Sequence, residues 1–237
     1  MNYPHVPPVA EIAGHFRNSL TQATRNESPY THWKLREVLP ESVCTGILTL
    51  PIAPPLLGHT DGTRGTYNDQ RTFLNPALRA KYPTCEGLAA ALQEPATAQL
   101  LARTCDIDVE GAYVRIEYMQ DLDGSWLEPH HDIPEKLFSM VIYLFVGPDS
   151  HDWGTDIYDS EKRWVSRSSG EFNSGTIFVP GENTWHGFLP QKGPRMSLQL
   201  CFCDSQAYVR SEYVRHRISA AAKSVPLIKK IIEWAPK

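Results

Sequence analysis

Between residues 111 and 204 the chain reads as eight strand-length segments in succession, and this feature constrains its fold more than any other. The segments cover 112–119, 125–131, 137–146, 155–159, 163–168, 175–180, 184–189 and 195–203. Glycine, proline, aspartate or serine punctuates most of the gaps between them. Short strands at this spacing are typical of all-β sandwiches and barrels. The pattern therefore predicts a mainly β fold with flanking helices, in the form of a jelly roll.

Segments with helical periodicity flank the predicted strands on both sides. They cover 8–24, 40–48, 76–82, 84–94, 95–104 and 206–222, and a further helix is expected to open at Ser224. A chain of 237 residues is long enough for one well-cored domain, and a second is not expected. We predict a single domain over 1–237, with a jelly-roll core at about 111–204 and helical support from 1–110 and 205–237.

Composition narrows the function classes. The formal net charge of −4 argues against a nucleic-acid groove, whose affinity would rest on clustered lysine and arginine. The five cysteines are odd in number and form no CxxC pair, so neither a disulfide framework nor a zinc knuckle is indicated. The first residues lack the features of a signal peptide, and no apolar run approaches the ~20 residues that span a bilayer. We expect a reduced, cytoplasmic protein that binds neither nucleic acid nor membrane.

An imidazole and a carboxylate are expected to meet at the end of the second segment, in His130-His131-Asp132. Side chains alternate along a strand, so His130 and Asp132 share a face while His131 points away. Together they supply two ligands of a 2-His-1-carboxylate site, which suits non-heme Fe(II) oxygenases. His186 is the best placed of the other histidines to complete it. For the triplet taken alone, a surface turn capped by Asp132 is the alternative.

An arginine follows His186 by nine residues and opens the last predicted strand, in Arg195-Met196-Ser197. We interpret the two segments as a hairpin whose loop takes residues 191–194, which puts His186 and Arg195 on the same face. Arg195 would then place a bidentate cation in the pocket that holds the metal. A carboxylate-binding group beside a metal indicates a dicarboxylate co-substrate.

These features together resemble the Fe(II)/2-oxoglutarate-dependent oxygenases, in the branch related to prolyl 4-hydroxylases. The resembling positions are Tyr118, Gly124, Pro129-His130-x-Asp132, the hydrophobic strand after them, Gly154-Thr155, Pro180-Gly181, His186 and Arg195-x-Ser197. Relatives often carry Gly-Gly where this chain has Gly154-Thr155, a departure in a strand turn. The resemblance implies a double-stranded β-helix of the cupin-like type, with Fe(II) at His130, Asp132 and His186. It also implies 2-oxoglutarate as co-substrate, held by Arg195, Ser197 and Tyr118.

The resemblance further implies an enzyme that consumes O2 and 2-oxoglutarate and releases succinate and CO2. It would hydroxylate or otherwise oxidise an unactivated C–H bond of a small molecule, such as an amino acid or a natural-product intermediate. Two alternatives stay open: a hydroxylase of peptide or protein side chains, and a non-catalytic jelly-roll binding module. The oligomeric state is left open.

Basic side chains are the candidate contacts to the substrate. They are Arg64, Arg71, Arg115 and Lys136. The segment 51–75 is rich in proline and glycine and is predicted to be a long loop. It is either a lid over the substrate, with Arg64 or Arg71 meeting an anionic group, or a solvated connection. Arg115 shares a strand face with Glu117, and the two form an ion pair or line the pocket.

Overall fold

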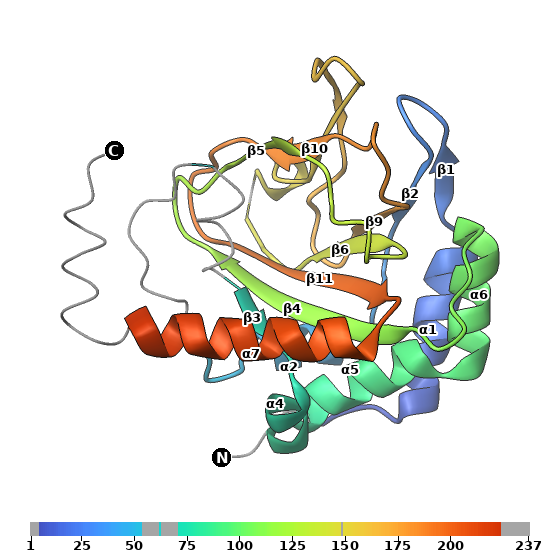
Figure 1. Ribbon diagram of the computed structural model, residues 1–237, viewed down its shortest axis with the longest axis vertical. Coiled ribbons are helices and arrows are strands. Elements are labelled where there is room, and N and C mark those ends of the chain that lie inside the picture. The colour runs from blue at the N-terminus through green and yellow to red at the C-terminus, as the bar shows by residue number, and fades with distance from the viewer. Residues whose placement is uncertain (1–4, 54–61, 63–70, 148, 224–237) are drawn as a thin grey trace.

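Two antiparallel β-sheets stacked on each other form the centre of the molecule (Figure 1). The computed structural model describes residues 5–53, 62, 71–147 and 149–223. Within these residues the large sheet has seven strands in the order β1-β2-β9-β6-β11-β4-β3, and the small sheet has four in the order β5-β10-β7-β8. The predicted jelly roll is therefore confirmed.

All eight predicted strands are present. In the large sheet they are β4 (Tyr113–Asp121), β6 (Ser139–Tyr143), β9 (Gly175–Phe178) and β11 (Arg195–Cys203). In the small sheet they are β5 (Leu127–His130), β7 (Asp156–Tyr158), β8 (Trp164–Arg167) and β10 (His186–Phe188). A short 3-10 helix, η2 (Ser150–Asp152), precedes β7.

Three further strands extend the large sheet at its two edges. They are β1 (Thr24–Asn26), β2 (His32–Leu35) and β3 (Arg71–Phe73). β3 pairs with β4 from within the segment that was predicted to be a loop. A run of three residues is too short to show an alternating pattern, so only its pairing with β4 makes it a strand.

The pairing of β11 with β4 decides which side chains face the small sheet. It runs in register without interruption from Arg195↔Asp121 to Cys203↔Tyr113. Because side chains alternate, odd-numbered residues of both strands lie on the inner face and even-numbered residues on the outer face. The inner face carries polar and charged groups, whereas the outer face supplies apolar residues such as Ile116 and Leu198 to the main hydrophobic core.

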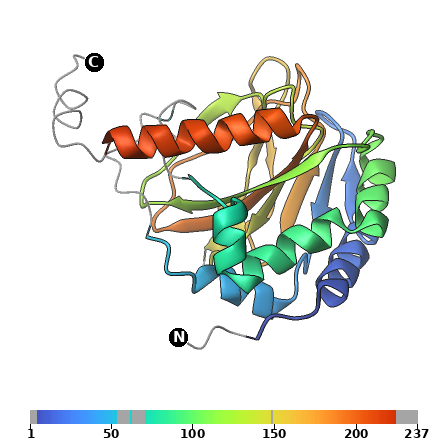
Figure 2. The same ribbon diagram turned by 60° about the horizontal axis from the view of Figure 1, so that its bottom comes forward.

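The outer face of the large sheet packs against helices, as predicted (Figure 2). They are α1 (Val9–Thr21), α2 (Glu41–Leu48), α4 (Pro76–Lys81), α5 (Pro83–Gln93) and α6 (Pro95–Cys105). Proline occupies the first position of α4, α5 and α6, where a missing N–H costs nothing. The side chain of Asn75 caps α4 by accepting from the N–H groups of Ala77 and Leu78.

The last described helix, α7 (Gln206–Lys223), lies on the opposite side of β4 and β11 from α5 (Figure 2). Its residue Val209 packs on the inner-face thiols of Cys201 and Cys203. The helix predicted from Ser224 lies outside the described residues. None of the helices within the described residues has both the length and the apolar character needed to cross a bilayer.

The predicted hairpin between the segments of His186 and Arg195 is wrong. β10 belongs to the small sheet and β11 to the large one, so the two strands do not pair. The turn between them carries the chain from one sheet to the other. Their functional side chains still approach each other because the inner faces of the two sheets line a common cleft.

Candidate functional site

Two histidines face each other across neighbouring strands of the small sheet. His186 of β10 is the register partner of His130 at the end of β5, and their ring centroids lie 4.3 Å apart. Asp132 follows β5 by two residues. One potential ligand atom from each of these three residues lies within 4.8 Å of the other two. The structure thus brings the predicted metal ligands together.

Backbone carbonyl groups orient both imidazoles. Nδ1 of His130 lies 2.9 Å from the carbonyl oxygen of Glu128, and Nδ1 of His186 lies 2.9 Å from that of Thr184. A carbonyl oxygen only accepts hydrogen bonds, so each Nδ1 carries the proton and donates it. Each Nε2 therefore presents the lone pair that a metal requires, and the ring is held at a defined angle.

The carboxylate of Asp132 is buried and held at both oxygens. The ammonium of Lys136 lies 2.6 Å from Oδ1, while the hydroxyl of Ser139 donates to Oδ2. Nε2 of His186 lies 3.8 Å from Oδ2, so this oxygen faces the histidines. Burial would raise the pKa of Asp132, but Lys136, His186 and the two hydrogen bonds hold that pKa well below its usual range.

His131 lies outside this cluster. Its ring packs on Trp185, with centroids 3.6 Å apart, and it is not among the three residues whose ligand atoms converge. This is the outcome expected from strand alternation, which turns His131 away from its two neighbours.

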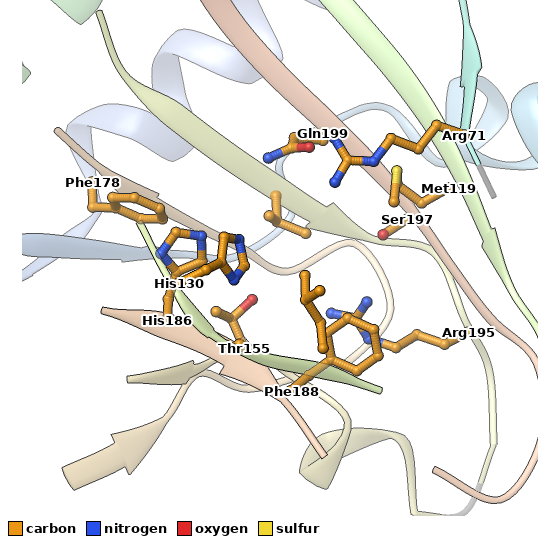
Figure 3. A pocket seen from close by; sticks show the side chains of 13 residues that line it. Arg71, Met119, His130, Thr155, Phe178, His186, Phe188, Arg195, Ser197 and Gln199 are labelled. Atoms are coloured by element: carbon orange, nitrogen blue, oxygen red, sulfur yellow. The ribbon is translucent and has the colours of Figure 1, made fainter. Parts of the chain in front are cut away.

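A cleft opens beside the two histidines, between the sheets (Figure 3). Much of its wall is apolar. The side chains concerned are those of Met119, Leu127, Val141, Phe178 and Phe188. Strand β11 contributes the polar residues Ser197 and Gln199 together with Arg195. An apolar cleft with a few polar groups beside a metal-ligand cluster has the composition of a small-molecule site.

Arg195 reaches the cleft from the start of β11 and is firmly held. Its Nε donates to the carbonyl oxygen of Trp153 at 2.9 Å, and its Nη1 donates to Asp121 Oδ2 at 2.9 Å. The guanidinium carbon lies 4.3 Å from the ring centroid of Phe188. Ser197 lines the same cleft. Arg195 and Ser197 therefore line the same cleft as His130 and His186.

Tyr118 is not brought to the cleft. It is an even-numbered residue of β4, so it faces the helices and belongs to the main hydrophobic core. Thr155 lines the cleft instead. The hydroxyl of Tyr143 donates to Thr155 Oγ1 at 2.6 Å, and the backbone N–H of Thr155 donates to Ser168 Oγ at 2.8 Å. The sequence pattern marks Gly154-Thr155 only as a strand turn, and Thr155 is not among the predicted site residues, because no pattern distinguishes a lone threonine.

Gly154 has a steric reason to be glycine. A Cβ at this position would collide with the backbone carbonyl oxygen of Ser168 on the neighbouring segment. The close approach brings Ser168 within reach of Thr155 and so supports the cleft wall. Position 155 does not require glycine, because the side chain of Thr155 has room to line the cleft.

The predicted basic contacts have different surroundings. Arg71 lines the cleft, and its Nη1 donates to Glu117 Oε2 at 2.9 Å. Arg115 forms a buried ion pair with the same carboxylate, at 2.8 Å from Oε1, and is not a lining residue. Lys136 forms a buried ion pair with Asp132. Arg64 lies outside the described residues.

The donor set fits a divalent transition metal. Two neutral imidazoles and one carboxylate on a single side of an ion form the facial arrangement of non-heme iron sites, with the remaining positions open. Lys136 and Ser139 hold the carboxylate of Asp132 in place, and His130, Asp132 and His186 are the residues that would hold the metal.

Removal of the ammonium group of Lys136 tests how strongly it stabilises the buried carboxylate of Asp132. Lys136→Met leaves a buried carboxylate without its cation, so the free energy of unfolding of the metal-free protein should fall by about 3–5 kcal/mol. Urea unfolding at neutral pH measures this fall. Arg163→Gln, which breaks the exposed pair with Asp159, is the control and should leave the free energy of unfolding nearly unchanged. If the two substitutions lowered the free energy of unfolding equally, Lys136 would not be the cation that stabilises the buried carboxylate of Asp132.

No family model matches the chain, and no curated protein matches it either. Solved structures do match. A prolyl-4-hydroxylase from Pseudomonas putida aligns with a TM-score of 0.53 and 15% identity, covering 82% of this chain and 100% of its own.

Two further structures have the same likeness. A prolyl hydroxylase from Trichoplax adhaerens, in complex with a hypoxia inducible factor oxygen degradation domain peptide fragment, aligns with a TM-score of 0.55 and 16% identity, covering 81% and 89% of the two chains. The viral collagen prolyl hydroxylase of Paramecium Bursaria Chlorella virus-1, as a 2-oxoglutarate complex, aligns with a TM-score of 0.52 and 13% identity. The alignment covers 74% of this chain and 96% of the viral chain. At such identities the likeness establishes the fold, and the chain has the jelly-roll fold of the prolyl 4-hydroxylase-type oxygenases.

Proposed function

We propose that the chain is an Fe(II)- and 2-oxoglutarate-dependent dioxygenase that oxidises an unactivated C–H bond of a small molecule. The observation that carries this proposal is the convergence of His130, Asp132 and His186 at the edge of a cleft that also contains Arg195. A binding module with the same fold has no need of three metal ligands and a buried arginine fork in one place.

The three ligands would hold Fe(II) on one face and leave its other positions to co-substrates. With iron bound, 2-oxoglutarate and O2 supply the oxidising chemistry, and succinate and CO2 are released. The chain itself contributes by holding the ligand side chains in position. The carbonyl groups of Glu128 and Thr184 fix the imidazole angles, and Lys136 fixes the carboxylate.

Arg195 and Ser197 would hold the distal carboxylate of 2-oxoglutarate. The guanidinium is anchored at Nε and Nη1 and packs against Phe188, so its position in the cleft is defined before any ligand arrives. Thr155 lines the same cleft and offers a hydroxyl. The Chlorella virus structure, which is a complex with 2-oxoglutarate, supports this co-substrate through its shared fold.

The apolar wall would keep water from the reacting centre and orient the substrate. Phe178 contacts the ring of His186, with centroids 4.6 Å apart, and Leu127 and Phe188 lie along the cleft. Aliphatic and aromatic groups beside the metal ligands suit a C–H bond, which offers no polar contact of its own.

A peptide side chain is the second candidate substrate. It is favoured by the neighbouring structures, which are prolyl hydroxylases, one of them with a bound peptide fragment. Conversion of 2-oxoglutarate to succinate by the Fe(II)-loaded protein tests the reaction class. Free amino acids, proline-containing peptides and natural-product scaffolds offered in turn distinguish the two substrate classes. Absence of Fe(II)-dependent 2-oxoglutarate binding would refute the proposal.

The metal ligands are tested by alanine substitution. His130→Ala, Asp132→Ala and His186→Ala should each abolish Fe(II) binding and turnover, because a facial site with two remaining ligands holds iron poorly. His131→Ala is the matched control and should keep the metal, since its ring packs on Trp185. Equilibrium dialysis with metal analysis measures binding directly. Retention of iron by His130→Ala with loss in His131→Ala would overturn the ligand assignment.

The co-substrate anchor is tested by Arg195→Gln. A hydrogen bond to a charged group contributes roughly 1.5–3 kcal/mol, so the apparent 2-oxoglutarate constant should rise about 10- to 100-fold. Iron binding should survive, because Arg195 is not a ligand. Pyruvate lacks the distal carboxylate, so it should be a poor co-substrate for the parent protein and hardly affected by the substitution. Unchanged 2-oxoglutarate dependence in Arg195→Gln would place the anchor elsewhere.

A further inference from the structure

Gln199 lines the cleft at a distance from the proposed 2-oxoglutarate anchor. It follows Arg195 by four residues on β11, with Ser197 between them on the same face. Because a strand rises about 3.3 Å per residue, the backbones at Arg195 and Gln199 lie about 13 Å apart. In Figure 3 Gln199 lies above the two imidazoles, whereas Arg195 lies below them and to one side. The metal ligands therefore have a polar neighbour on the side that Arg195 does not occupy.

The amide of Gln199 is half-buried and makes no hydrogen bond to any residue in the described part of the chain. Its two register partners explain why. Val141 on β6 has an apolar side chain. The carboxylate of Glu117 on β4 is bound by Arg71 and Arg115 instead. A polar group that is partly buried without a partner costs free energy, so a ligand that pairs with this amide would be stabilised here.

The surroundings of Gln199 are largely apolar. Met119 and Phe178 line the cleft on either side of it (Figure 3). Arg71 lies on the same side of the cleft, but its guanidinium is bound to the carboxylate of Glu117 at 2.9 Å. This ion pair gives no reason to expect an anion. Gln199 is thus a residue whose hydrogen-bonding groups a neutral ligand can use.

The geometry of an amide restricts which ligand groups match it. The group is planar and presents a carbonyl acceptor beside an NH2 donor. A carboxylate only accepts, so one of its oxygens would face the carbonyl oxygen of the amide. A peptide bond is almost always trans, which puts its N–H and its C=O on opposite edges. A primary carboxamide has both groups on one edge, and it forms two parallel hydrogen bonds with another amide.

We infer that the primary substrate carries a primary carboxamide, which Gln199 binds through a pair of hydrogen bonds. This inference rests on the proposed function and names its substrate class. The carbon atoms next to the carboxamide would lie along the apolar wall, where Phe178 contacts the ring of His186. A small amide meets the requirement, as does the side chain of an asparagine or glutamine residue. The backbone of a peptide does not.

The test uses binding and needs no knowledge of the natural substrate. The full-length protein is loaded with Mn(II), which accepts the same imidazole and carboxylate ligands as Fe(II), and with saturating 2-oxoglutarate. Proton relaxation in solution then reports which small molecules come near the paramagnetic ion. The probes are propionamide, propionate and N-methylpropionamide, whose amide is trans like a peptide bond. We expect saturable relaxation enhancement for propionamide, and about 5- to 100-fold weaker binding of the other two.

A substitution assigns the binding to Gln199. Gln199→Leu should weaken propionamide about 5- to 100-fold and leave 2-oxoglutarate binding unchanged. Gln22→Leu, at an exposed glutamine that follows α1, is the matched control and should change neither. Unchanged propionamide binding in Gln199→Leu overturns the inference, as does equal binding of propionate and propionamide to the parent protein. Loss of 2-oxoglutarate in Gln199→Leu also overturns it, since Gln199 would then be a co-substrate contact.

The design separates this inference from the proposed function. If 2-oxoglutarate itself shows no enhancement with the parent protein, the proposed function fails and the inference falls with it. If 2-oxoglutarate binds and propionamide does not, only the substrate class fails. Should Gln199→Leu not fold, Gln199→Glu keeps the size of the side chain, removes its donors and is expected to weaken propionamide similarly. The comparison of the three probes requires no variant.

Two sources of the carboxamide are distinguished by competition. Free asparagine and a pentapeptide with an internal asparagine are each used to displace propionamide from the parent protein. Displacement by free asparagine at the lower concentration indicates a small-molecule substrate, in agreement with the proposed function. The reverse order indicates the side chain of a peptide, and the role of Gln199 is the same in both cases.

Discussion

The register between β4 and β11 is the constraint on which the rest of the molecule depends. Nine consecutive pairs, from Arg195↔Asp121 to Cys203↔Tyr113, fix the parity of both strands at once. A slip by one residue would exchange the two faces. Arg195, Ser197 and Gln199 would then point at the helices, and apolar residues such as Leu198 would point into the cleft. Burial of the apolar outer face against the helices therefore also orients the polar inner face.

The inner face of the large sheet carries several buried ion pairs. Pairs such as Arg71 with Glu117 and Arg195 with Asp121 are desolvated, and buried ion pairs contribute little net stability. The stabilising burial takes place on the other side of the sheet, where α1, α5 and α6 contribute to a continuous apolar core. Because the apolar core lies on the outer face of the sheet, the inner face can carry polar side chains that bind a ligand.

The metal-ligand cluster depends on both sheets. His130 and His186 come from the small sheet, where neighbouring strands pair them. The cation that holds Asp132 comes from the other side, because the backbone of Lys136 forms a β-bridge with Cys203 at the end of β11. The distance between the two sheets therefore affects how the three ligands are arranged. A rigid sandwich keeps the site formed before a metal arrives.

The sequence by itself determined the eight central strands, most of the helices and the shared face of His130 and Asp132, because alternation and spacing are local properties of the chain. His186 was predicted to join them as the best placed of the other histidines and through the family resemblance, not through a local pattern. The tertiary structure decided what depends on distant partners. It made β3 a strand, placed β10 and β11 in different sheets and turned Tyr118 into the core. It also brought Arg71 to the cleft, where its pairing with Glu117 joins residues 46 positions apart. No local pattern encodes such contacts, since they arise only when the sheets close.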